Sequence, residues 1–299
     1  MRPAILAVLV SACSAFGSPA QAPAPQNPSP MSDTTRPHPR VTQESPRGQR
    51  AAIGAGTLFI REGLRPRDRL ALVVHFHGAP WLVERHVATA GLDAALVTFQ
   101  LGSGSGVYGK AFADASAFGA LLEEARTASA RLLGRRVSFD PVVLTSFSAG
   151  YGAVRAILRV PDHFARVGAV ILADSLHAGY EGDAGAPRSL DPKVASQDLD
   201  VFLRLASEAA AGRKHLLVTH SEVFPGTYAS TTETADALLG SAGVARRARL
   251  AEGPLGMQQL SDSGRGSLRV LGFAGNSAPD HMDHLYALGN WLRRLDVLR

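Results

Sequence analysis

Short apolar runs alternate with longer stretches of helical period along most of this chain, and this alternation constrains the fold more than any other feature. The apolar runs predict buried strands at residues 70–76, 95–99, 142–145, 167–173, 215–219 and 268–273. The stretches of helical period predict helices at residues 111–133, 151–158, 197–211, 230–239 and 282–298. Strands that are apolar along their whole length are buried on both faces, and such strands with helices between them form parallel sheets. We therefore predict an α/β fold with a doubly wound, mostly parallel central sheet flanked by helices.

The composition is that of a chain that can bury one large core. The chain has 299 residues, 45% of them hydrophobic, and a formal net charge of +5. The basic residues are almost all arginines, and they are scattered. The densest cluster (Arg246, Arg247 and Arg249) is short and has no aromatic residues within it. It indicates a solvated surface, so we expect no nucleic-acid partner.

The N-terminus has the pattern of an export signal. Arg2 precedes an apolar stretch at residues 4–10, and small residues suited to signal-peptidase cleavage follow up to residue 22. Cys13, the only cysteine, follows Val-Ser-Ala in a pattern that resembles the lipobox of bacterial lipoproteins. We predict a signal peptide at residues 1–22, with a lipoprotein signal that ends before Cys13 as the alternative. The protein is then exported, and is either periplasmic, secreted or tethered to the outer membrane through a lipidated Cys13.

A proline-rich segment separates this signal from the folded part. Residues 23–50 contain few large apolar side chains, so they cannot bury enough surface to offset the entropy lost on ordering. We predict a disordered linker there and one folded domain at residues 51–299. Within that domain, the stretch between residues 174 and 215 is long enough for a small lid insertion but not for a large cap domain.

Residues 140–160 combine a strand, a cluster of small residues and a helical pattern, with Ser148 at the junction. A serine held in a sharp strand-to-helix turn is a nucleophile elbow, whose usual pattern is Gly-x-Ser-x-Gly. Here Gly150 follows the pattern, and Ser146 takes the place of the first glycine. The alternative is an ordinary helix cap in which Ser148 accepts a backbone hydrogen bond.

Two further strand ends carry polar or glycine-rich turns. The strand at 70–76 is followed by a His-Gly step, which predicts an oxyanion hole made from the backbone of Gly78 and Ala79 together with the N–H of Ala149. The strand at 95–99 is followed by a glycine-rich segment without a phosphate-binding fingerprint. We predict that this segment is a flexible loop that lines the site, with Tyr108 in contact with substrate, and we expect no cofactor.

The later strands end in carboxylates and histidines. Asp174 follows the strand at 167–173, Glu222 follows the strand at 215–219, and His281 and His284 come just before or within the last helix. His281 and His284 are three residues apart and lack the four-residue spacing with a glutamate of zinc proteases, so we expect no metal. The chain order is therefore serine, carboxylate, histidine.

With these motifs, residues 70–299 resemble the α/β-hydrolase superfamily. The resemblance rests on the His-Gly turn, on the elbow from Ser146 to Gly150, on the acids after later strands and on the C-terminal histidines. It implies a serine nucleophile, a histidine base and an acid that orients the histidine.

Carried over residue by residue, the resemblance makes Ser148 the nucleophile. We predict His281 as the base, because it extends the apolar stripe of the last helix, with His284 as the alternative. We predict Asp174 as the acid, because a charge at the end of an apolar strand requires a partner, with Glu222 as the alternative. His177 is a candidate substrate contact.

The predicted function is that of an exported serine hydrolase acting on small-molecule or polymer-borne carboxylic esters. A serine amidase or peptidase is one alternative. The other is a non-catalytic binding lipoprotein on the same fold, because a fold does not determine function.

Overall fold

The computed structural model describes residues 36–38, 41–65, 67–182 and 193–298. The predicted signal peptide, Cys13 and the first part of the predicted linker lie outside the described residues. The predicted lid between residues 174 and 215 lies partly outside them. None of the helices within the described ranges has the length and apolar character needed to cross a membrane.

Ten strands of the described chain form one sheet in the order β1-β2-β4-β3-β5-β6-β7-β10-β9-β8. Their bounds are β1 Gly48–Ile53, β2 Gly56–Arg61, β3 Arg69–Phe76, β4 Ala94–Phe99, β5 Ser138–Phe147, β6 Val167–Ala173, β7 His215–His220, β8 Ala248–Glu252, β9 Gln258–Arg265 and β10 Leu268–Phe273. The strands from β4 to β10 in this order are parallel neighbours, and each edge ends in antiparallel strands. The predicted mostly parallel sheet is confirmed.

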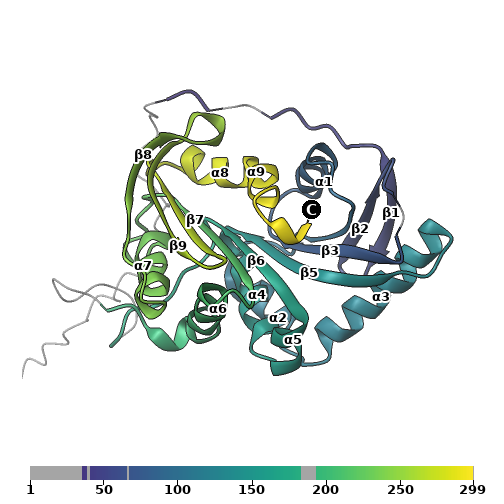
Figure 1. The fold of residues 1–299 in the computed structure, drawn as a ribbon, viewed down its shortest axis with the longest axis horizontal. Helices are drawn as coiled ribbons and strands as arrows, with labels where there is room; N and C mark the ends of the chain where they lie inside the picture. Colours follow the sequence, from purple (N-terminus) through teal and green to yellow (C-terminus); the bar gives the residue numbers. More distant parts are fainter. Residues whose placement is uncertain (1–35, 39–40, 66, 183–192, 299) are drawn as a thin grey trace, which may run out of the picture.

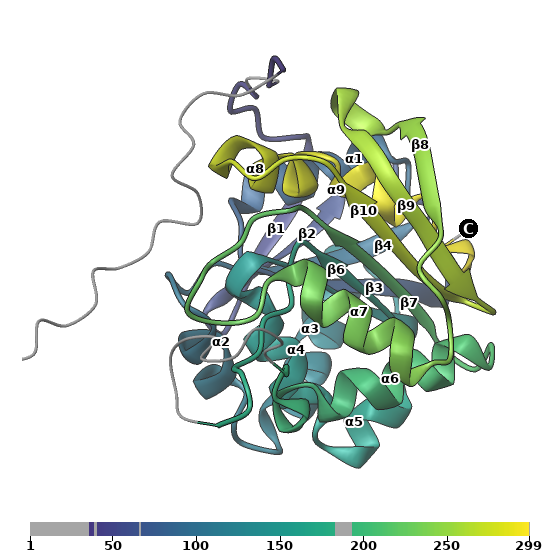
Figure 2. The same ribbon diagram turned by 90° about the vertical axis from the view of Figure 1, so that its left-hand side faces the viewer.

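Helices cover both faces of the sheet (Figure 1, Figure 2). Their bounds are α1 Pro80–Thr89, α2 Ser105–Ala111, α3 Ala117–Leu133, α4 Tyr151–Leu158, α5 Pro161–Arg166, α6 Asp200–Ala210, α7 Thr231–Ser241, α8 Ala278–Tyr286 and α9 Leu288–Leu292. Helices α1, α8 and α9 pack on one face, where they share an apolar cluster with the sheet. Helices α2 to α7 pack on the other face in a second, larger cluster. This two-sided covering explains why the central strands are apolar along their whole length.

All six predicted strands are present, with ends that differ by a few residues. Strands β1, β2, β8 and β9 were not predicted. They form the outer parts of the sheet. Strands β1, β8 and β9 are partly or mostly exposed and lack the continuous apolar run that identifies a central strand. Strand β2 is mostly buried, but its apolar run is only three residues long, at residues 58–60. Strand β1 begins at Gly48 and therefore spans the predicted domain boundary at residue 51.

The helices differ more from expectation. The predicted glycine-rich loop contains α2, and the predicted helix at 111–133 begins only at Ala117, after α2 has ended. The helix predicted at 282–298 begins earlier, because Ser277 caps α8 in a reciprocal capping box with Asp280, and it is interrupted between α8 and α9. Helices α1 and α5 were not predicted.

Helices α2 and α4 approach each other closely at a glycine. A Cβ atom added to Gly152 in α4 would lie 2.1 Å from the carbonyl oxygen of Ser105 in α2. Only a residue without a side chain permits this contact. The contact holds α2 next to the start of α4, at the carboxyl edge of the sheet.

We expect Gly152→Ala to lower the free energy of unfolding by about 1–3 kcal/mol, because the new methyl group collides with backbone and the helices must separate. Gly119→Ala in α3 is the matched control, since its Cβ would meet no atom within 4 Å. It should leave the free energy of unfolding unchanged or raise it by up to about 1 kcal/mol. Urea unfolding of both variants measures the difference; equal effects would contradict the close approach of α2 and α4.

Candidate active site

Ser148 lies in a sharp turn between β5 and α4. Its φ is 47°, in the left-handed region that non-glycine residues rarely adopt. A Cβ atom added to Gly150 would lie 2.1 Å from the carbonyl oxygen of Phe76 in β3, so the turn packs directly on the neighbouring strand. The N-cap of α4 is Gly150, and no side-chain capping bond is made there. The local structure therefore has the strained strand–turn–helix form of an elbow.

Ser146 has a structural role that explains its departure from glycine. Its side chain is fully buried, and its Oγ lies 2.8 Å from the Oγ of Ser175. Ser175 in turn donates to the carbonyl oxygen of Ser148, also at 2.8 Å. Because the Ser175 proton is used in that bond, Ser146 donates to Ser175. This chain of hydrogen bonds ties the elbow to the segment after β6. No sequence signal identified Ser175.

Asp174 and His281 come together although they are 107 positions apart. Asp174 directly follows β6 and is 1% exposed, and its Oδ2 lies 2.7 Å from His281 Nδ1. A carboxylate can only accept, so His281 donates from Nδ1, and in the neutral ring Nε2 is then an acceptor. The His281 ring stacks on Phe147, the neighbour of Ser148, with centroids 4.5 Å apart. Among the described residues no hydrogen bond joins the Ser148 hydroxyl to His281, as is common for catalytic pairs before substrate binds.

Further donors surround the same carboxylate. The backbone N–H of Ser221 donates to Oδ1 at 2.9 Å, and the Ser221 hydroxyl donates to Oδ2 at 2.6 Å. Thr231 at the start of α7 donates to Oδ1 at 2.5 Å. Burial by itself raises the pKa of Asp174, but nearby His284 and the hydrogen bonds from His281 and Ser221 outweigh it and hold the pKa well below its usual range. These partners therefore favour the charged form of Asp174 and hold its carboxylate from several sides.

The alternative acid and base lie elsewhere. Glu222 joins two loops, because its backbone N–H donates to Gly275 O at 2.8 Å and its Oε2 accepts from Gly275 N at 3.2 Å. His284 is buried against β7, where its Nδ1 lies 2.7 Å from Thr219 Oγ1. Burial lowers the pKa of His284. The structure thus places Asp174 in a hydrogen bond with His281. Glu222 and His284 make hydrogen bonds with other residues.

The predicted oxyanion donors differ in availability. The N–H of Gly78 donates to Gln100 Oε1 at 2.7 Å, so this amide is already occupied. Ala79 is the N-cap of α1, and within the described chain no acceptor contacts its N–H. Ala149 directly follows the elbow serine, and both residues line a cavity beside the elbow. The arrangement therefore favours Ala79 over Gly78 as the partner of Ala149.

A cavity of about 500 Å³ opens beside the elbow. It is lined by Gly104, Ser105, Ser148, Ala149, Tyr151, Arg155, His177, Ala178, Gly179, Asp198 and Tyr228. His177 donates from Nδ1 to Ala229 O at 3.0 Å and meets Tyr228 edge-on, and burial lowers its pKa. Sequence reasoning missed Tyr151, Arg155, Asp198 and Tyr228, because they come from three separate segments without a shared pattern: α4, the turn at Ser196–Asp198 and the loop before α7.

The structure corrects the prediction for Tyr108. This side chain is fully buried and is not among those that line the cavity. Its hydroxyl lies 2.9 Å from His77 Nδ1, donates to Gly102 O and accepts from Leu101 N. The segment around Tyr108 folds as α2 and turns the ring inward. Tyr108 thus links α2 to the loops after β3 and β4 through hydrogen bonds.

The elbow serine, the buried acid after β6 and the histidine of α8 all lie at the carboxyl edge of the parallel strands, in the chain order Ser, Asp, His. The chain has the α/β-hydrolase fold.

No family model matches the sequence, and no curated protein matches it. Similar solved structures of low sequence identity include an arylesterase, 13% identical over 88% of each chain with a TM-score of 0.46. A dienelactone hydrolase from Anabaena variabilis is 12% identical over 84% of this chain and 96% of its own, with a TM-score of 0.40. A soluble variant of monoglyceride lipase from Saccharomyces cerevisiae is 10% identical over 86% of this chain and 98% of its own, with a TM-score of 0.41.

Because Asp174 is buried and hydrogen-bonded, we expect its substitution to change the free energy of unfolding. Asp174→Asn should lower the free energy of unfolding by about 3 kcal/mol, because an amide nitrogen cannot accept from the donors that the carboxylate satisfies. Glu222→Gln, at an exposed residue, should change it by less than about 0.5 kcal/mol. Urea unfolding at pH 7 measures both. A larger loss in Glu222→Gln would show that the acid at this edge has been misassigned.

Proposed function

We propose that this protein is an exported serine hydrolase that cleaves carboxylic esters with Ser148, His281 and Asp174. The observation that carries the proposal is the 2.7 Å hydrogen bond from His281 Nδ1 to buried Asp174, in a histidine whose ring stacks beside the elbow. Export is supported by the N-terminal sequence pattern alone.

The geometry supports the following course of reaction. Asp174 holds the proton of His281 on Nδ1, so Nε2 is free to take the proton of Ser148. The Ser148 oxygen then attacks the ester carbonyl and forms a tetrahedral intermediate, whose oxyanion is stabilised by the N–H groups of Ala149 and Ala79. His281 returns the proton to the leaving alcohol, and a water molecule activated by His281 hydrolyses the acyl-enzyme.

The lining of the cavity supports a polar substrate. Aromatic rings of Tyr151, His177 and Tyr228 lie beside Arg155 and Asp198, and Tyr228 is 41% exposed. Such a lining combines stacking surfaces with hydrogen-bonding groups. It suits small or polymer-borne esters that carry hydroxyl groups better than esters of long alkyl chains. No step of this reaction requires a cofactor.

A fluorophosphonate probe tests the nucleophile directly. The wild type should be labelled, and Ser148→Ala should not be labelled. The same substitution should lower kcat/KM toward p-nitrophenyl acetate at least about 10³-fold. Ser138→Ala, at the opposite end of the same strand, is the control and should leave both unchanged.

Two outcomes would overturn the proposal. Labelling that persists in Ser148→Ala would assign the nucleophile to another residue. A wild type that is neither labelled nor active on a panel of esters would favour a binding protein on the same fold.

A further inference from the structure

The first described residues of the chain contact the helix that carries His281. Arg36 donates to Asp280 Oδ1 at 3.3 Å, forms a short ion pair with Asp283 Oδ2 and donates to Leu255 O at 3.3 Å. His38 Nδ1 lies 2.9 Å from Asp283 Oδ2. Figure 1 shows the N-terminal segment, in purple, crossing the layer of α1, α8 and α9 before it enters β1. The last part of the predicted linker is therefore packed against the domain.

The two aspartates flank His281 in the first turns of α8. Asp283 is fully buried, and such a carboxylate requires a compensating charge, which Arg36 supplies. Asp280 accepts from both the N–H and the hydroxyl of Ser277 through its other oxygen, so it also caps the helix. The contacts of Arg36 and His38 thus act on the same turn of α8 that presents His281.

We propose that Arg36 and His38 are positioning residues that clamp the start of α8 and hold His281 against Asp174 and Phe147. The catalytic consequence rests on the proposed hydrolase function. Neither residue touches the reacting atoms, so both act through the helix. A shift of about 1 Å in a catalytic group can cost about 10²-fold in rate, so the position of α8 matters.

The same cluster has the composition of a metal site. Donor atoms of His38, Asp280 and Asp283 lie within 4.8 Å of one another, and His38 Nε2 and Asp283 Oδ1 are buried without a hydrogen-bond partner in the described chain. The Arg36 guanidinium already supplies a positive charge between both carboxylates. The contacts therefore favour an arginine clamp, and metal binding is an outcome of the test.

The test compares Arg36→Ala/His38→Ala with wild type in two measurements. Hydrogen exchange at the amides of 280–286 should be at least about tenfold faster in the variant, because the clamp no longer opposes local opening. The kcat should fall about 10- to 100-fold while KM changes less than about twofold. Arg36→Lys should recover part of both effects. Arg47→Ala, an exposed arginine on the same segment, is the control and should change neither.

The clamp is overturned if exchange in α8 is unchanged in the double variant, or if exchange rises while kcat stays at the wild-type value. It is also overturned if dialysis of the wild type against EDTA speeds exchange in α8 and added Zn²⁺ alone returns the exchange rate to its original value. A bound metal ion would then stabilise the start of α8 in place of Arg36. A wild type without ester hydrolysis would refute the proposed function, whereas hydrogen exchange would still report on the clamp.

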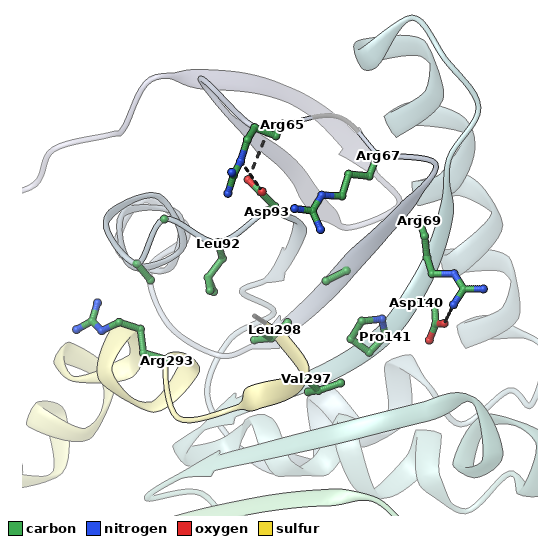
Figure 3. Close-up of a pocket in the computed structure, with 13 residues that line it drawn as sticks. Arg65, Arg67, Arg69, Leu92, Asp93, Asp140, Pro141, Arg293, Val297 and Leu298 are labelled. Carbon is green, nitrogen blue, oxygen red and sulfur yellow. Dashed lines mark hydrogen bonds and ion pairs between the residues drawn. The ribbon is translucent and has the colours of Figure 1, made fainter.

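A separate observation concerns a cavity of about 530 Å³ at the amino-terminal edge of the sheet. Four arginines surround it, as Figure 3 shows: Arg65, Arg67, Arg69 and Arg293. Arg65 pairs with Asp93 and Arg69 pairs with Asp140, both at 3.1 Å. Arg67, between them in sequence, has no ion-pair partner among the described residues.

The rest of this cavity is largely apolar. Its lining includes Ala71, Leu92, Pro141, Val297 and Leu298. Since Arg65 and Arg69 are paired with aspartates, Arg67 is the cavity-lining charge without an ion-pair partner in the described chain, and it lies beside an apolar surface. Guanidinium groups bind phosphate oxygens well, and the apolar surface has room for a short hydrocarbon. We infer that this cavity binds a phosphate monoester with a short alkyl group, with Arg67 as the main contact to the phosphate.

Calorimetric titration with hexyl phosphate tests this site. Binding should weaken at least about tenfold in Arg67→Ala and stay unchanged in the control Arg47→Ala. Inorganic phosphate should bind at least about tenfold more weakly than hexyl phosphate, because it buries no apolar surface. The inference fails if hexyl phosphate does not bind, if binding is independent of Arg67, or if inorganic phosphate binds equally well.

Discussion

The carboxylate of Asp174 lies at the end of β6, where it is almost completely removed from solvent and accepts hydrogen bonds from four donors. These donors belong to the loop after β7, to the start of α7 and to α8. A buried charge is tolerated only when it is fully partnered, so this one carboxylate obliges three separate parts of the chain to meet at the same edge of the sheet. The geometry around His281 depends on that meeting.

The elbow is likewise held by close packing and by buried hydrogen bonds. Gly150 lets the turn pack on the backbone of Phe76, and the Ser146–Ser175 pair ties the carbonyl of Ser148 to the segment beside Asp174. The unusual Ser146 is therefore more than a tolerated small residue. Through Ser175 it connects the turn that carries the serine to the strand end that carries the acid.

Helix α8 is held from two sides. From within, Asp174 accepts from His281; from outside, Arg36 and His38 contact Asp280 and Asp283. The apolar packing of Leu285 on the lower part of the helix adds a third constraint. Each buried charge in these turns has a desolvation cost, which the contacts with Arg36 and His38 offset.

The sequence by itself determined the central strands, the two-sided helical layers and the elbow at Ser148. Each of these is encoded in local pattern: continuous apolar runs mark strands buried on both faces, and small residues mark a sharp turn. Strands β1, β8 and β9 were missed, because a half-exposed strand carries no such run. Strand β2 is mostly buried and was missed because its apolar run is only three residues long, at residues 58–60.

Only the tertiary structure showed which of the two acids is hydrogen-bonded to which of the two histidines: Asp174 contacts His281, whereas Glu222 contacts Gly275 and His284 contacts Thr219. All four residues occupy comparable places in the sequence, at strand ends or in the last helix. Their difference lies in which donors and acceptors the packed layers bring within hydrogen-bonding distance. The same holds for Ser175, whose partners are 27 and 29 residues away, and for Arg36, whose partners named above are 219 to 247 residues away. Contacts over such separations depend on how the layers pack, and a local pattern does not contain that information.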